Sequence, residues 1–80
     1  GGAHAGYRVY ACADGRVAVA ALEPHFAAAL ATVAELKVHQ TSDWFVEATR
    51  TQLARYFKRL SRAQLATIAA ANDLPIHTMP

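Results

Sequence analysis

One carboxylate in this chain stands where a strand pattern gives way to a helix pattern. Glu23 is followed by Pro24, and proline suits the first turn of a helix, where its missing N–H costs nothing. The positive end of a helix favours a negative charge, so we expect Glu23 to be ionised at neutral pH. An ionised carboxylate can orient a histidine or accept a hydrogen bond, but it is a poor general acid. Acidic residues also cap helices, and spacing alone favours that simpler role.

Four cationic side chains recur at intervals of three and four residues: Arg55, Lys58, Arg59 and Arg62. This spacing would let them share a face where a second helix meets a third. Exposed lysine and arginine are the norm, so a solvated face is the favoured interpretation. The alternative is an anion site for a phosphate-bearing ligand or for nucleic acid.

The other residues that could do chemistry are scattered along the chain. The histidines are His4, His25, His39 and His77, and no two have the spacing of helical metal ligands. Cys12 has no second cysteine near it and is expected to be a small apolar residue within a strand. We therefore expect no metal site and no cofactor.

The bulk composition bounds the class of protein. Eighty residues suffice for one domain, with a thin core that gains stability from a partner or from self-association. An apolar share of 54% argues against disorder, and a net charge of +2 does not by itself predict a polyanion partner. A single cysteine excludes an internal disulfide and fits a reducing, cytoplasmic setting. No apolar run approaches membrane-spanning length, and no signal peptide is visible.

The N-terminal part of the chain predicts a β-hairpin over residues 7–22. Alternating side chains lead to Asp14 and Gly15, a strong turn signal, and an apolar return strand follows. The return strand is apolar on both sides, which is compatible with both faces being covered. From Pro24 the pattern becomes helical and continues to Leu36.

Two further helices and an extended tail complete the expected fold. A second helix can begin at Thr41 or Ser42, with its apolar face formed by Phe45, Leu53, Phe57 and Leu60. A capping box from Ser61 to Gln64 starts a third helix, and Asp73 follows its end. The prolines in residues 74–80 forbid helix there. We therefore predict one α+β domain with an N-terminal β-hairpin, three helices and an extended C-terminal tail.

The hairpin and the segment after it resemble a known family. The motifs occur in the order Gly1-Gly2-Ala3, an aromatic hairpin with Ala13-Asp14-Gly15 at its turn, and Ala20-Ala21-Leu22-Glu23-Pro24-His25-Phe26. This order resembles the small domain of the family III CoA-transferases (CaiB/BaiF type), particularly the alpha-methylacyl-CoA racemase branch. The later part of the chain agrees more loosely, through Phe57, the restart at Ser61 and Arg62, and Asp73.

The resemblance implies a function for two residues of this chain. Members of the family rearrange or transfer acyl-CoA thioesters and form interlocked dimers, with the active site between the large domain of one subunit and the small domain of the other. In the racemases, a histidine and an aspartate of the large domain move the proton at the α-carbon. The residue matching the glutamate that supports this histidine is Glu23, and the residue matching the aromatic that approaches acyl-CoA is Tyr7.

These features are compatible with three functions for this chain. The first is a small domain or remnant of an acyl-CoA transferase or racemase, which lacks the large-domain catalytic residues and is not complete alone. Its partners would be a large domain or a second copy, and acyl-CoA is the possible ligand. The second is a stand-alone, self-associating interaction module. A nucleic-acid binder is least favoured, because the turn before Arg62 lacks a glycine and no convincing set of base-reading side chains is present.

Overall fold

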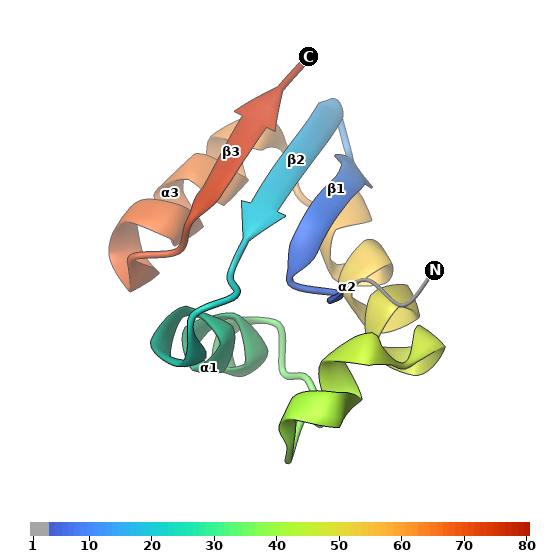
Figure 1. Cartoon of the computed structure of the whole chain (residues 1–80). Coiled ribbons are helices and arrows are strands. Elements are labelled where there is room, and N and C mark those ends of the chain that lie inside the picture. The colour runs from blue at the N-terminus through green and yellow to red at the C-terminus, as the bar shows by residue number, and fades with distance from the viewer. Residues whose placement is uncertain (1–3) are drawn as a thin grey trace.

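A three-stranded antiparallel sheet carries all the helices on one of its faces (Figure 1). The computed structural model describes residues 4–80. In chain order the elements are β1 (Tyr7–Cys12), β2 (Gly15–Ala20), α1 (Pro24–Val33), the 3-10 helix η1 (Thr41–Phe45), α2 (Glu47–Lys58), α3 (Arg62–Asn72) and β3 (Ile76–Met79). The predicted α+β class, with a hairpin followed by three α-helices, is confirmed.

The C-terminal tail is a strand of the sheet. The strand order is β1-β2-β3, and β3 pairs antiparallel with β2. The extended conformation was predicted from the prolines, but the pairing was not. Ile76 is buried against the helices and fixes which side of β3 faces the core. Pro75 and Pro80 bound this short edge strand, and proline at a strand end limits further pairing with other chains.

The turn of the hairpin is shifted by one residue from its predicted place. Ala13 and Asp14 form the turn, and Gly15 is the first residue of β2, paired with Cys12. Neither turn residue has a positive φ. Gly15 is needed for another reason, because a Cβ there would collide with the backbone carbonyl oxygen of Met79. The glycine therefore permits the end of β3 to approach β2 closely.

The second helix begins later than predicted. Residues 41–45 form a 3-10 turn, because the Asp43 carboxylate accepts the backbone N–H groups of His39 at 2.8 Å and Gln40 at 3.1 Å. Val46 is then extended, with φ −90° and ψ 149°, and α2 starts at Glu47. The interruption rotates the chain, so Trp44 is buried and Phe45 is 43% exposed. The prediction that Phe45 shares the apolar face of α2 was therefore wrong.

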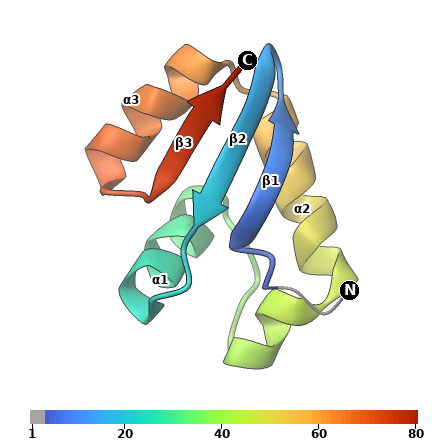
Figure 2. The same ribbon diagram turned by 45° about the horizontal axis from the view of Figure 1, so that its top comes forward.

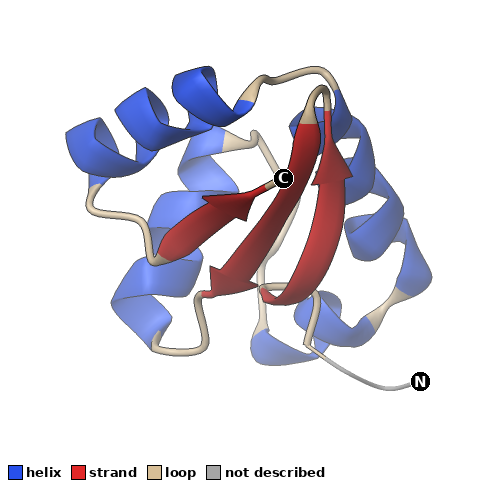
Figure 3. Cartoon of the chain, turned by 90° about the horizontal axis from the view of Figure 1, so that it is seen from above, coloured by secondary structure: helices blue, strands red, loops and turns tan. Residues whose placement is uncertain are grey.

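The core lies between the sheet and the helices. The largest fully buried side chains are Phe57, Leu30, Leu53, Leu65 and Val17. The Phe57 ring lies 5.2 Å from that of Tyr10, whose hydroxyl donates to the Ala5 carbonyl at 2.6 Å. Figures 2 and 3 show the strands on the near side, with α1 and α2 behind them. One face of the sheet is therefore packed, and the other is not covered by the part of the chain that the structure describes.

Helix ends follow local signals. The capping box of α3 is formed as predicted, because the Ser61 hydroxyl accepts from the Gln64 backbone N–H and the Gln64 side chain accepts from that of Ser61. Asp73 ends α3 in the left-handed conformation with φ 51°. The first helix ends at Val33, earlier than the predicted Leu36, because Glu35 also turns left-handed with φ 55°. Left-handed residues close helices by presenting the next N–H groups to the last carbonyls.

Asp14 joins the hairpin to the start of α3. Its carboxylate accepts the Arg62 backbone N–H at 2.7 Å, and the Arg62 Nε lies 3.6 Å away. The pKa of Asp14 is held below its usual value, first by the hydrogen bond from that N–H and then by the Arg62 charge, while partial desolvation opposes them. Because the pKa of Asp14 is lower in the folded state, the unfolded chain binds more protons than the folded chain as the pH falls. The contribution of Asp14 to stability is thus present above its ordinary pKa and is lost as the pH falls through the folded one.

We expect Asp14→Asn to be destabilising at neutral pH and close to neutral in acid. The variant removes the charge that faces Arg62 and the positive start of α3, and the native side chain loses the same charge once it is protonated. The measurement is the urea midpoint of both proteins at several pH values from about 7 down to about 2, so that the series passes below the depressed pKa of folded Asp14 as well as its ordinary value. A difference in midpoint that is the same at all of these pH values would contradict this assignment.

Candidate functional site

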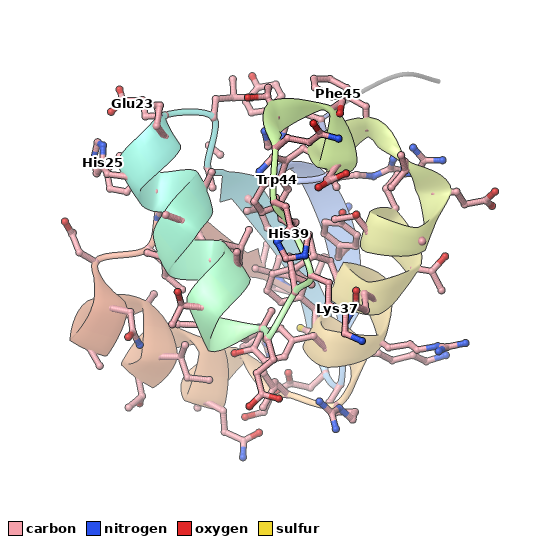
Figure 4. The ribbon with its side chains drawn as sticks, turned by 90° about the horizontal axis from the view of Figure 1, so that it is seen from below. Glu23, His25, Lys37, His39, Trp44 and Phe45 are labelled. Carbon is pink, nitrogen blue, oxygen red and sulfur yellow. The ribbon has the colours of Figure 1, made fainter. Side chains whose placement is uncertain are left out.

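Glu23 does not cap the helix that it precedes. Its backbone is extended, with φ −69° and ψ 141°, and its side chain makes no capping hydrogen bond to α1. The side chain is 68% exposed, and in Figure 4 it points away from the body of the molecule. The capping role that spacing favoured is therefore wrong, because the carboxylate makes no hydrogen bond to the first N–H groups of α1.

A histidine of the same helix turn stands beside this carboxylate. The Nε2 atom of His25 lies 3.7 Å from the Oε2 atom of Glu23, and the His25 side chain is 67% exposed. Pro24 between them starts the helix and places both side chains on the outer side of its first turn (Figure 4). A separation of 3.7 Å is that of an ion pair and is too long for a hydrogen bond. Glu23 can thus pair with protonated His25 and remains able to accept a hydrogen bond from another donor.

The strand β2, which forms part of the uncovered face of the sheet, ends three residues before Glu23. Tyr7 is 56% exposed and is paired with Ala20, three residues before Glu23. Val9, Ala18 and His77 form the next row across the three strands. These five residues, with Arg8 and Val19, line a shallow hollow of about 330 Å³. An apolar hollow with one aromatic and one imidazole can take the apolar part of a ligand.

The comparison with protein families decides the identity of the chain. The profile of CoA-transferase family III matches residues 1–79. The chain belongs to CoA-transferase family III. No curated protein matches it.

The family match includes both Tyr7 on the uncovered sheet face and Glu23 before α1. Tyr7 lies at the start of β1, Ala20 ends β2, and Glu23 leads into α1. The segment from Ala20 to Phe26, which carries the resemblance, therefore spans the junction between the uncovered sheet face and α1. Ala20 is exposed on that face beside Tyr7.

His77 is a residue of this surface that sequence reasoning missed. It was assigned to an extended tail, but β3 pairs it with Ala18 on the same face as Tyr7. The local signal was the alternation of Ile76, His77 and Thr78, with one buried residue followed by an exposed one. That signal shows a strand with two unlike faces but not its place in the sheet.

The stripe of four cations is divided by the structure. Arg55, Lys58 and Arg59 line one cavity at the end of α2. Arg62 lies beyond the turn, at the start of α3, where it faces Asp14. The predicted face shared by all four is thus not formed, because residues 59–61 redirect the chain between the two helices.

A second cavity, of about 300 Å³, lies between α1 and η1 and is lined by His4, His39 and Trp44 among others. The His4 Nδ1 atom accepts the Gly6 backbone N–H at 2.9 Å, and its ring stacks on Trp44 at 4.9 Å. Burial lowers the pKa of His4, which favours the neutral imidazole whose Nδ1 atom can accept this hydrogen bond. His4 is therefore a structural residue that anchors the start of β1 to η1.

Among residues 4–80, no group of three or more His, Cys, Asp or Glu side chains is arranged to hold a metal ion. Cys12 is buried, with its Sγ atom 3.9 Å from an Asp14 oxygen, so it behaves as a core residue. Within the same range, no helix has the length and apolar character needed to cross a membrane.

Proposed function

We propose that this chain acts as the small domain of a family III acyl-CoA enzyme of the alpha-methylacyl-CoA racemase branch, in an assembly with a large domain. The observation that carries the proposal is the exposed Glu23 carboxylate, which the fold does not use as a helix cap. Family membership supports the acyl-CoA chemistry, since the matched region includes the Glu-Pro motif.

In this proposal, Glu23 supports a reaction whose proton-transfer groups belong to the large domain. A histidine there removes or returns the proton at the α-carbon of the acyl group, and its second ring nitrogen donates to Glu23. The carboxylate fixes the tautomer of that histidine and stabilises its protonated form, which a third group commonly does for a catalytic base. Tyr7 and the neighbouring row of Val9, Ala18 and His77 contact the acyl-CoA from the uncovered face of the sheet.

His25 adds a competing partner for Glu23. When protonated and not facing a large domain, the imidazole can hold the carboxylate by charge across 3.7 Å. When a histidine of the large domain docks, it offers a true hydrogen bond, which is stronger than a solvated pair of exposed charges. His25 therefore acts as an exchangeable partner rather than a member of the reacting group.

The direct test is assembly with a large domain, followed by ligand titration. We expect this chain to co-purify with a family III large domain encoded in the same genome. Addition of acetyl-CoA to the assembly should shift the NMR signals of Tyr7 and Glu23. Lack of association, together with no response to acetyl-CoA in the mixture, would overturn the proposal.

A second candidate, self-association, is favoured by one observation. Tyr7 and Val9 expose 56% and 53% of their surface on the uncovered sheet face, and paired apolar faces commonly form two-fold interfaces. If this is the function of the surface, Tyr7→Ser should convert a dimer to a monomer in sedimentation analysis. A wild-type chain that is monomeric at high concentration would remove this candidate.

A further inference from the structure

A cavity at the far end of α1 from Glu23 gathers three cations. It has a volume of about 510 Å³ and lies between the residues that end α1 and the last two turns of α2. Its lining consists of Ala34, Glu35, Gln52, Arg55, Tyr56, Lys58 and Arg59. Figure 4 places Lys37, on the link after α1, at this end of the molecule and Glu23 with His25 at the other.

The fold leaves a net positive charge in this cavity, since its lining holds three cations and one carboxylate, that of Glu35. Among residues 4–80, the two ion pairs involve other residues, so none of the three cations has a carboxylate at ion-pair distance. The one acidic residue of α2 is Glu47, in its first turn. Arg55 and Arg59 are one helical turn apart, where like charges repel each other. The helix dipole favours cations in a last turn, but it does not require them to line one cavity.

The neutral groups of the cavity complement these cations. Gln52 supplies an amide, and the half-buried residue Tyr56 supplies a hydroxyl. Burial raises the pKa of Tyr56, so its hydroxyl stays protonated and can donate. Guanidinium groups bind phosphate oxygens through paired hydrogen bonds, which makes arginine the preferred residue for phosphate recognition.

We propose that this cavity binds the diphosphate group of a small molecule. Arg55 and Arg59 each contact one phosphate, since side chains one turn apart on a helix are separated by about 5–6 Å at Cβ. Lys58 adds a third charge, and Gln52 and Tyr56 donate hydrogen bonds. Glu35, on the opposite wall, repels the ligand and limits its affinity. The proposal goes beyond the acyl-CoA function and does not depend on it.

The test is calorimetric and NMR titration of the chain with sodium pyrophosphate at low ionic strength. We expect amide shifts confined to residues 34–35 and 52–59. Arg55→Gln and Arg59→Gln should each weaken binding about tenfold, the effect typical of losing a charge-assisted contact. Glu35→Gln should instead tighten binding about threefold, because it removes a nearby like charge. If Glu35 had only a structural role, its replacement by glutamine would not be expected to raise the affinity for pyrophosphate.

The matched control is Arg50→Gln, which makes the same charge change on α2 but lies outside the cavity lining. It should alter the affinity by less than about twofold, as screening weakens the effect of distant charges. Binding that falls equally in Arg50→Gln and Arg55→Gln, or shifts spread over the surface, would overturn the proposal. Inorganic phosphate that binds as tightly as pyrophosphate would also overturn the assignment to a diphosphate.

Two further ligands identify the source of the diphosphate group. ADP and CoA both carry it, and each is titrated in competition with pyrophosphate. Displacement by ADP alone assigns the cavity to a free nucleotide, and displacement by CoA assigns it to the acyl carrier. Failure of both to displace pyrophosphate would overturn the proposal for any nucleotide-linked diphosphate, whereas the acyl-CoA function would still be judged by Glu23 and Tyr7.

Discussion

Glu23→Gln is expected to lower the turnover of acyl-CoA by the assembled enzyme at least about tenfold, a modest share of the effect of general acid–base catalysis. Glutamine keeps the shape of the side chain but cannot stabilise a protonated histidine. The loss should appear in kcat rather than KM, because in the proposed assembly the carboxylate supports the catalytic histidine and does not bind the substrate. The measurement is steady-state kinetics of α-proton exchange with the large domain present.

The same substitution should leave the stability of the chain nearly unchanged. The Glu23 side chain is exposed and makes no capping hydrogen bond, and surface changes of this kind are usually within about 0.5 kcal/mol. His25→Gln is the matched variant, since it removes the competing partner in this chain but leaves the carboxylate. Its turnover should equal or exceed that of the wild type. Full turnover by Glu23→Gln would remove the catalytic role of this residue.

Phe57→Ala is expected to lower the free energy of unfolding by about 3–5 kcal/mol, the usual cost of removing a buried aromatic ring. Phe57 is 1% exposed and packs on Tyr10 beneath the sheet. A loss of that size is a large share of the stability of a small domain, so the variant should be substantially unfolded at 37 °C. Urea unfolding followed by the fluorescence of the single tryptophan, Trp44, measures the change.

Phe45→Ala is the control for this measurement. Phe45 is 43% exposed, and its ring is nearly perpendicular to that of His4, with 5.3 Å between the two ring centroids. Its removal should cost less than about 1 kcal/mol, as expected for a partly exposed residue. Equal costs for the two variants would restore the prediction that both phenylalanines share one buried face and would contradict the 3-10 turn.

Features with a local physical cause were predictable from the sequence. The capping box at Ser61 and Gln64 uses groups three residues apart, so it forms whenever the helix forms. The hairpin depends on strand alternation and on a short turn, and it was placed correctly except for a shift of one residue at Gly15. The family segment around Glu23 was recognisable for the same reason, since its motifs are continuous in the chain.

Features that depend on distant contacts were not predictable. Trp44 and Phe45 are adjacent and both apolar, and the bonds of Asp43 to the preceding link decide which of them is buried. Arg62 has the helical spacing of Arg55 and Arg59, but Asp14 in the hairpin turn holds it elsewhere. A period of three or four residues predicts one face only while the helix is unbroken.

The sequence by itself determined the α+β class, the family segment, and the place of Glu23 before Pro24, because each rests on residues close together in the chain. Only the tertiary structure decided that the Glu23 carboxylate is free of a capping role, with His25 at 3.7 Å. It likewise decided that β3 brings His77 to the face of Tyr7, and that three of the four cations share a cavity with Glu35. Side-chain orientation and pairing between strands depend on packing against segments distant in sequence, which no local pattern specifies.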